Sequence, residues 1–210
     1  MIPTHNQSVY LPSIILNSLG TNYEKKKIKM KLIVDEDIVL EGSSIMYVSE
    51  LFEIIQNNRD YLSVFLPWVD HMAKEADFRE YILNAIFKNQ EHYEASFTII
   101  YQGKAVGRIG LHHLNRHNKL GAIGYWIDQK KNGKGIVVKS CKRLITYGFE
   151  ELGLNRIEIK AAVENLKSQA IPQKLNFKKE GILRQAEYVN EKYLDLTLYS
   201  LLKDEYLASK

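Results

Sequence analysis

The stretch that decides the fold is GYWIDQKKNGKGIVVKSCK, residues 124–142. It begins as an apolar strand, passes through a loop that contains Gly133 and Gly135, and continues into a basic helix. From Lys130 to Arg143 there are six basic residues and no acidic one. Glycines let the backbone approach a ligand closely, and the first N–H groups of a helix attract anions. The stretch therefore indicates a seat for a phosphate-bearing ligand. The alternative is a plain glycine turn before a solvated basic helix.

The patterns on both sides of this stretch predict one α/β domain over residues 30–208. Alternation of apolar and polar residues marks strands, and apolar residues at three- and four-residue steps mark helices. The expected strands cover 37–42, 94–101, 105–114, 120–128, 155–163, 180–190 and 192–202. The expected helices cover 44–57, 58–68 with a stop at Pro67, 74–90, 135–152, and 168–176 with Ser168 as N-cap.

The composition describes an ordinary soluble globular protein, with 45% apolar and 26% charged residues among 210. A net charge of +4 suits an anionic ligand but is too small to imply nucleic-acid binding. The single Cys141 excludes an internal disulfide and fits a reducing cytoplasm. No apolar run approaches the roughly 18 residues that a membrane span requires. We therefore expect a cytoplasmic protein without a membrane or nucleic-acid partner.

The N-terminal residues 1–29 read differently from the remainder and are expected to be an extension outside the domain. The segment EKKKIK, residues 24–29, matches what a purine-rich ribosome-binding site would encode if it were translated. This predicts that Met30 is the natural start and that residues 1–29 are not native. The alternative is a flexible N-terminal extension.

Three histidines, His112, His113 and His117, raise the question of a metal site. Adjacent residues on a strand point to opposite faces of the sheet, so His112 and His113 are poorly placed to bind one ion. We expect no metal. Cys141 lies on the apolar face of the predicted helix 135–152, where packing is the expected role.

With the predicted strands and helices in this order along the chain, two stretches resemble the GNAT N-acetyltransferase superfamily. They are residues 124–142 and residues 161–206, AAVENLKSQAIPQKLNFKKEGILRQAEYVNEKYLDLTLYSLLKDEY. More narrowly, the chain resembles the Rim-type enzymes that acetylate N-terminal serine or alanine on ribosomal proteins. The resemblance covers residues 30–206. Its second motif is Asn165 and Ser168 followed by KLNF and EG. Lys130 stands where the family has Gln or Arg, and Asn176 where it has glycine, although asparagine tolerates the left-handed cap.

The resemblance implies an α+β GNAT fold, with a mixed, mostly antiparallel sheet flanked by helices. Two central strands, 120–128 and 155–163, are expected to splay apart. It implies transfer of an acetyl group from acetyl-coenzyme A to a primary amine, with the N-terminal amine of a ribosomal protein as acceptor. An acetyltransferase for small amines such as polyamines, amino acids or antibiotics, and a non-catalytic acyl-coenzyme-A-binding module, are the alternatives. A homodimer is compatible with the family.

The resemblance also implies roles for particular residues. Glu187 is the expected general base, and its alternative is an exposed strand carboxylate without a catalytic role. Ser168 is the expected hydroxyl acid near the sulfur, and its alternative is a helix cap. The residues expected to contact the cofactor are Trp126, Ile127, Lys131, Gly133, Lys134, Gly135, Ile136, Asn165 and Tyr199. Trp68 and Asp70 are expected near the acceptor. The alternatives are a turn residue for Asn165, a core residue for Tyr199, and closure of a helix pair for Trp68 and Asp70.

The acid–base chemistry favours an N-terminal acceptor. An α-amino group titrates near 8, so about a tenth of it is neutral at pH 7. A lysine side chain titrates near 10.4, and its far smaller neutral fraction adds about 3 kcal/mol to the barrier. A carboxylate base that acts directly or through water is therefore better matched to an α-amino group.

Overall fold

The computed structural model describes residues 31–210, so the expectations for residues 1–29 and for a start at Met30 lie outside the described part. The strands are β1 (Lys31–Ile33), β2 (Ile38–Gly42), β3 (Ala95–Tyr101), β4 (Lys104–Asn115), β5 (Leu120–Ile127), β6 (Arg156–Ala162), β7 (Lys178–Val189) and β8 (Lys192–Leu202). The α-helices are α1 (Val48–Asn57), α2 (Arg59–Ser63), α3 (Glu75–Gln90), α4 (Ile136–Thr146), α5 (Leu166–Lys174) and α6 (Lys203–Ala208).

The strands form one mixed sheet in the order β1-β2-β3-β4-β5-β6-β8-β7. Every neighbouring pair is antiparallel except β5 and β6, which are parallel. These two strands pair only over residues 120–122 and 156–158. Beyond that point they diverge, which confirms the predicted splay and the predicted fold class.

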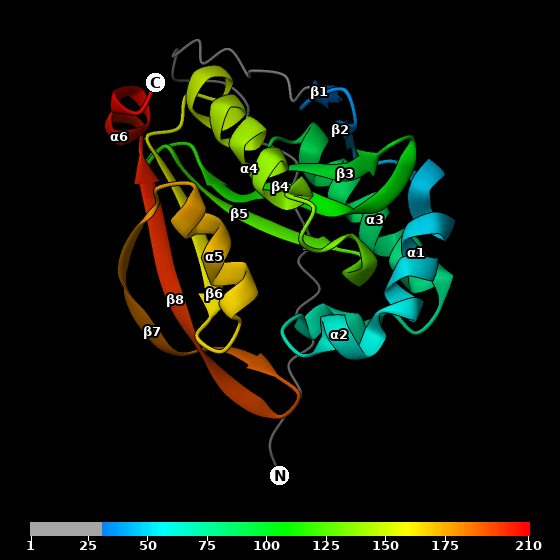
Figure 1. Ribbon diagram of the computed structural model, residues 1–210. Coiled ribbons are helices and arrows are strands. Elements are labelled where there is room, and N and C mark those ends of the chain that lie inside the picture. Colours follow the sequence, from blue (N-terminus) through cyan, green and yellow to red (C-terminus); the bar gives the residue numbers. More distant parts are fainter. Residues whose placement is uncertain (1–30) are drawn as a thin grey trace, which may run out of the picture.

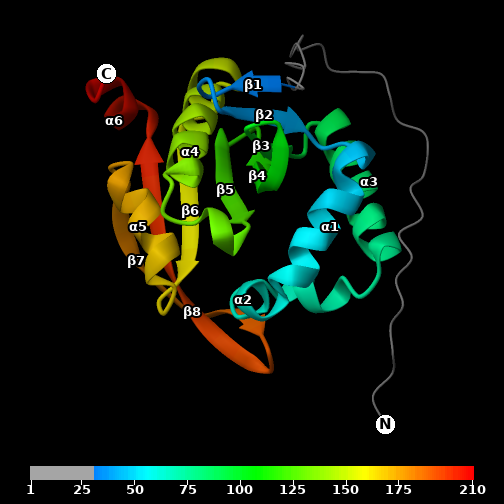
Figure 2. The ribbon, with the colours of Figure 1, turned by 45° about the vertical axis from the view of Figure 1, so that its right-hand side comes forward.

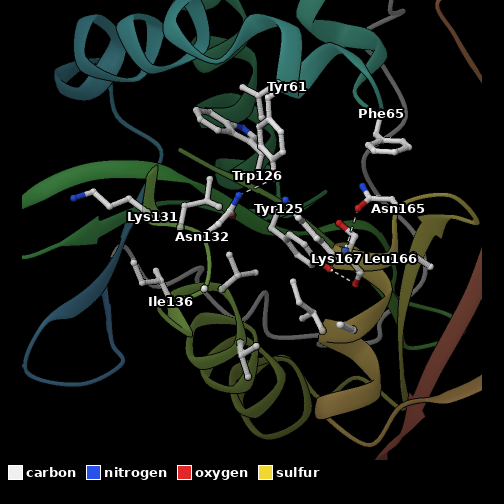
Figure 3. A pocket seen from close by; sticks show the side chains of 18 of the residues that line it. Tyr61, Phe65, Tyr125, Trp126, Lys131, Asn132, Ile136, Asn165, Leu166 and Lys167 are labelled. Carbon is white, nitrogen blue, oxygen red and sulfur yellow. Dashed lines mark hydrogen bonds between the residues drawn. The ribbon is translucent and has the colours of Figure 1, made fainter. Parts of the chain in front are cut away.

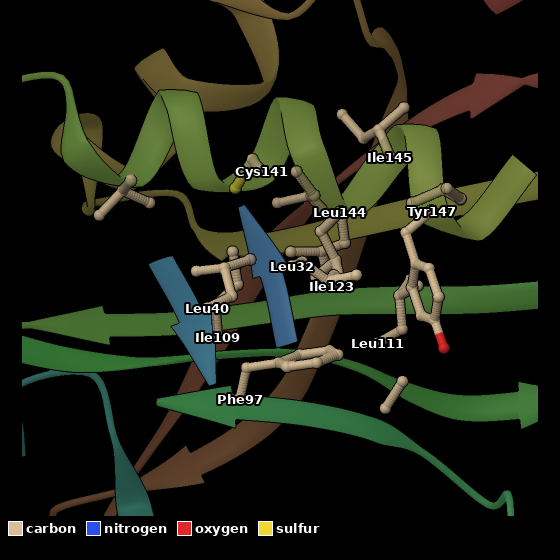
Figure 4. Close-up of a cluster of buried hydrophobic side chains, with 14 of the residues drawn as sticks. Leu32, Leu40, Phe97, Ile109, Leu111, Ile123, Cys141, Leu144, Ile145 and Tyr147 are labelled. Carbon is tan, nitrogen blue, oxygen red and sulfur yellow. The ribbon is translucent and has the colours of Figure 1, made fainter. Parts of the chain in front are cut away.

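The helices cover both faces of the sheet (Figures 1 and 2). Helices α1 and α3 lie on one face, and their apolar residues pack with Trp126 of β5 in one buried cluster. Helix α4 lies on the other face over a larger cluster (Figure 4), in which Cys141 and Leu144 are fully buried. The packing role expected for Cys141 is therefore confirmed. The two buried clusters therefore lie on opposite faces of the sheet.

Helix α5 differs from the prediction at its start. Asn165, not Ser168, is the N-cap, because the Asn165 side chain accepts a hydrogen bond from the Ser168 backbone N–H at 3.1 Å. The N-cap expected at Ser168 is therefore wrong by three residues. Asn176 follows the helix with φ +59°, which confirms that it takes the left-handed position usually held by glycine.

Helix α4 ends earlier than predicted. The α-helical turns stop at Thr146, and Tyr147–Glu151 continue as a π-helical turn. The backbone N–H of Leu152 bonds the carbonyl of Tyr147 at 3.0 Å. A Cβ atom at Gly148 would come within 2.9 Å of Ile157, so the wide turn and the glycine together let this segment lie close against β6.

Short elements account for the other differences. The predicted first helix begins with a 3-10 turn over Ile45–Tyr47, and Pro67 opens a 3-10 turn over Pro67–His71 instead of only ending a helix. Strand β1 and helix α6 were not predicted as elements. Both are short, three and six residues, and give little periodic signal. Within residues 31–210 the structure has no helix that meets the length and apolarity needed to span a bilayer.

The left-handed cap at Asn176 gives a stability prediction. Asn176→Ala should lower the free energy of unfolding by about 1 kcal/mol, because a Cβ without a compensating polar side chain is unfavourable at positive φ. Asn176→Gly should match or exceed the parent chain. Urea unfolding of the three chains measures this, and Asn57→Ala, at an exposed helical position, is the matched control. Equal stability of the Ala and Gly variants would contradict the prediction.

Candidate functional site

A cavity of about 860 Å³ opens where β5 and β6 diverge, and the glycine loop, α4, α5 and α2 form its walls (Figure 3). Among the residues predicted for the site, those that line it are Trp126, Ile127, Lys131, Gly133, Gly135, Ile136, Asn165 and Ser168. These residues come from β5, the following loop, and the start of α5, which are separated in the sequence. The structure therefore brings most of the predicted cofactor residues around one space.

The N-terminus of α4 opens into this cavity. Gly135 is its N-cap with φ +74°, and no side chain caps the helix. Gly133 also has positive φ, +77°, and a Cβ at either glycine would meet no atom within 4 Å. The first N–H groups of an α-helix lack intrahelical partners, and here they start beside Ile136, which lines the cavity. This end of the cavity is built to hold an anion.

Positive charge gathers at the same end. The ammonium groups of Lys131 and Lys134 lie 5.6 and 5.9 Å from the centre of the Tyr101 ring. Lys139, one turn into α4, is instead paired with Asp35 at 2.8 Å. Lys134 is exposed and does not line the cavity itself, so its expected contact with the cofactor stays a prediction. Lys131, which does line it, is the better placed cation.

The glycine loop is fixed by the segment that links α1 and α2. The buried Asn58 side chain accepts a hydrogen bond from the Gln129 backbone at 3.0 Å, and Asn132 donates to the Tyr61 hydroxyl at 3.0 Å. Across the cavity, Lys167 lies over the Tyr61 ring at 5.8 Å. Sequence analysis missed Asn58 and Tyr61 because these contacts join residues about 70 positions apart, which no local pattern reveals.

A hydrogen bond to a backbone carbonyl of α5 connects this wall of the cavity to β5. The carbonyl has no donor within the helix because of a proline. Pro172 lies inside α5 and has no N–H to donate to the carbonyl of Ser168 four residues earlier. The Tyr125 hydroxyl donates to that carbonyl at 3.1 Å. Burial raises the pKa of Tyr125, so its hydroxyl stays protonated and able to donate. This bond bridges the two diverging halves of the sheet.

Glu187, the predicted base, lies on β7 after an irregular register between Leu183 and Glu187. Its side chain is half-buried, and burial raises the pKa of its carboxyl group. It is not one of the residues that line the cavity. The tip of its hairpin reaches α2, because the Asn190 side chain donates to the Ser63 carbonyl at 3.0 Å. Glu187 therefore lies on the β7–β8 hairpin, whose far end extends to α2, one of the elements that line the cavity (Figure 1).

The remaining predicted residues lie outside the large cavity. Tyr199 is buried in the core, and its hydroxyl donates to Gln169 at 2.9 Å, as expected for the core alternative. Trp68 packs on Tyr81 and lines a second, smaller pocket. Asp70 is exposed and lines neither. Within residues 31–210 no three His, Cys, Asp or Glu side chains are grouped to hold a metal ion.

Comparison with known proteins identifies the family. The family model described as Acetyltransferase (GNAT) domain matches residues 46–178. The chain is 38% identical to YdaF of Bacillus subtilis (strain 168), over 84% of this chain and 97% of that protein. It is 30% identical to the ribosomal-protein-serine acetyltransferase of Escherichia coli (strain K12), over 81% and 96%. The structure matches RimL, the ribosomal L7/L12 α-N-protein acetyltransferase in complex with coenzyme A, with a TM-score of 0.80, 27% identity, and coverage of 83% and 98%. The chain belongs to the GNAT acetyltransferase family.

The bond between Tyr125 and Ser168 can be tested by stability. Tyr125→Phe should lower the free energy of unfolding by about 1 kcal/mol, because it removes one hydrogen bond and leaves the Ser168 carbonyl without this donor. Tyr193→Phe, at a tyrosine that is 64% exposed on the β7–β8 hairpin, is the control and should change stability little. Equal unfolding curves for Tyr125→Phe and the parent chain would show that the bridge contributes nothing.

Proposed function

We propose that this GNAT acetyltransferase transfers the acetyl group of acetyl-coenzyme A to the N-terminal amine of a ribosomal protein. The observation that carries the proposal is the uncapped α4 N-terminus, which opens with two positive-φ glycines and Lys131 into a cavity at the β5–β6 divergence. The Escherichia coli relative and RimL, both named for this activity, align with nearly their whole length. These similarities support a protein N-terminus as the acceptor.

The residues present fit the donor substrate. Its pyrophosphate is a dianion, and the N–H groups from Gly133 to Ile136 with the charge of Lys131 would hold it. Its long amide-bearing arm needs backbone partners, and the main chain of β5 faces the cavity where its pairing with β6 has ended. Asn165, at the start of α5, would bond the same arm. The thioester would then lie beside Ser168 and Tyr125.

The reaction joins the amine nitrogen to the thioester carbonyl carbon and breaks the carbon–sulfur bond. The amine must lose a proton, and we assign that proton to Glu187, directly or through water. The leaving sulfur must gain one, and the Ser168 hydroxyl at the cavity wall is the assigned donor. Because an α-amino group is already about a tenth neutral at pH 7, a carboxylate of modest basicity is sufficient.

A product assay tests the function. The protein is incubated with acetyl-coenzyme A and peptides that begin with Ser, Ala or Met, and thiol release is recorded. Release with a free N-terminus and none with its acetyl-blocked form supports the proposal. Release only with polyamines, amino acids or antibiotics would replace it with a small-amine function. Binding of coenzyme A without any thiol release would replace it with a non-catalytic module.

The glycine seat gives a binding prediction. Gly135→Val should abolish the rise in melting temperature that coenzyme A produces, because a β-branched residue at φ +74° forces the backbone away from its anion-binding shape. Gly153→Val is the control, since Gly153 has φ +73° in the connection before β6, beyond the opposite end of α4 from this loop. The control should lose stability yet keep the coenzyme A shift. An undiminished shift in Gly135→Val would contradict the seat.

The base gives a kinetic prediction. Glu187→Gln should lower kcat by about 100-fold or more near neutral pH while the coenzyme A shift stays nearly unchanged. Because burial raises the pKa of Glu187, activity of the parent chain should be present above that raised value and fall as pH drops through it. Glu191→Gln, at the exposed tip of the same hairpin, is the matched control. Full activity of Glu187→Gln across the pH range would exclude Glu187 as the base.

A further inference from the structure

A second pocket of about 130 Å³ lies on the opposite face of the sheet from α4 and shares Leu66, Tyr125 and Trp126 with the large cavity. Gly124 on β5 lines this pocket, and Gly110 on β4 is its cross-strand partner. A Cβ at Gly124 would lie 3.2 Å from the His112 ring, and one at Gly110 would lie 2.9 Å from the Ser96 backbone. The absence of a side chain at Gly124 leaves this space open beside His112. By liquid volume it could hold roughly four water molecules.

A buried arginine dominates this pocket. Arg108 is 4% exposed, and its guanidinium stacks over the Tyr81 ring with 5.0 Å between the guanidinium carbon and the ring centre. One terminal nitrogen, Nη2, donates to Ser43 at 2.8 Å, and the other, Nη1, is buried without a hydrogen-bond partner among residues 31–210. An unpaired buried donor on a charged group is costly, so few are found in folded proteins without a ligand or water to satisfy them.

A second donor in the lining is also unpaired. In the part of the chain that the structure describes, the indole nitrogen Nε1 of Trp126 has no hydrogen-bond partner, and Trp126 is 7% exposed. Figure 3 shows the Trp126 side chain on the large-cavity side. An indole N–H and a guanidinium can only donate. Both unpaired groups therefore call for an oxygen that accepts hydrogen bonds. The surrounding rings of Trp68 and Tyr81 restrict the space around that oxygen to a short group.

The charges next to this pocket indicate whether the oxygen it accepts belongs to a hydroxyl or to a carboxylate. His112, which lines the pocket, bonds through Nδ1 to Glu94 at 2.9 Å. Burial pushes the pKa of Glu94 upward, but the hydrogen bond to His112 and the nearby basic groups of His112, Lys88 and Arg108 together outweigh burial, so the pKa lies below its usual value and the group is ionised. A ligand carboxylate would add a second negative charge beside Glu94, which bonds His112 and already offsets the charge of Arg108. A neutral hydroxyl adds none.

We propose that this pocket selects the acceptor: it takes the hydroxyl-bearing side chain of the residue whose amine is acetylated, with Arg108 as the hydrogen-bond donor. The proposal rests on the N-terminal acetyltransferase function above. Because the two spaces share Leu66, Tyr125 and Trp126 in their linings, an acceptor with its first side chain in the small pocket would have its amine next to the large cavity. Arg108 is thereby a specificity-determining residue, separate from the proton-transfer groups Glu187 and Ser168.

The test compares short peptides that are identical after a first residue of Ser, Ala, Gly or Asp. For each, kcat/KM is measured with the parent chain, Arg108→Met, Arg108→Lys and the control Arg79→Met, which replaces an arginine on the exposed surface of α3. The parent should prefer Ser over Ala by about 10- to 100-fold, the range of a hydrogen bond to a charged group. Arg108→Met should bring that ratio near one, Arg108→Lys should keep part of it, and Arg79→Met should keep all of it.

The coenzyme A shift in melting temperature serves as the check that each variant retains its donor site. If Arg108→Met fails to melt cooperatively, Gly124→Ala decides, because its methyl group narrows the pocket without removing a buried charge. It should lower the Ser-to-Gly ratio of kcat/KM while the coenzyme A shift persists. An unchanged ratio would then overturn the proposal.

Other outcomes also overturn it. A loss of equal size for all four peptides in Arg108→Met would place the arginine on the peptide main chain. A preference for Asp over Ser would make the pocket a carboxylate site. If the parent chain acetylates peptides but the Ser-to-Ala ratio is the same in Arg108→Met, only the pocket assignment fails. If the parent chain acetylates no peptide at all, the proposed function fails and the pocket assignment fails with it.

Discussion

The separation of β5 from β6 is the constraint on which the rest of the molecule depends. Three residue pairs hold these parallel strands together, and then they part. The glycine loop leaves the end of β5, and α5 leaves the end of β6, so each arm of the split carries one wall of the large cavity. A proline in α5 leaves the Ser168 carbonyl without a donor within the helix, and the Tyr125 hydroxyl on β5 donates a hydrogen bond to it across the gap. This hydrogen bond ties the two walls of the opening together.

The two faces of the sheet carry different binding features. On the α4 face, uncapped helix N–H groups and Lys131 gather around positive-φ glycines. On the face covered by α1 and α3, a buried arginine and aromatic rings surround a much smaller space. The segment from Asn58 to Leu66, which contains α2, touches both, since Asn58 fixes the glycine loop and Leu66 lines both spaces. A single short segment therefore links the shape of one pocket to that of the other.

Much of this could be predicted from local sequence patterns. The glycine loop, the long strands and the face of α4 have strong periodic or turn signals, and the structure has them nearly as expected. The start of α5 was misplaced because Asn165 and Ser168 are both good caps, and only the hydrogen bond between them shows which one acts. Arg108 could not be predicted, because a lone basic residue in a strand looks like a solvated one. Its burial arises from packing against Tyr81, 27 positions away in the chain.

The divergence of β5 and β6 has one more consequence, for the behaviour of the protein in a crowded solution. Where two strands separate, each keeps a row of backbone groups that no neighbouring strand satisfies, and such rows on an outer strand invite other chains to add on and aggregate. Here the rows face one another inside the molecule, with α4 and α5 on one side and α2 at the mouth. The fold can offer main-chain pairing to a narrow substrate arm while denying the same pairing to a stray polypeptide.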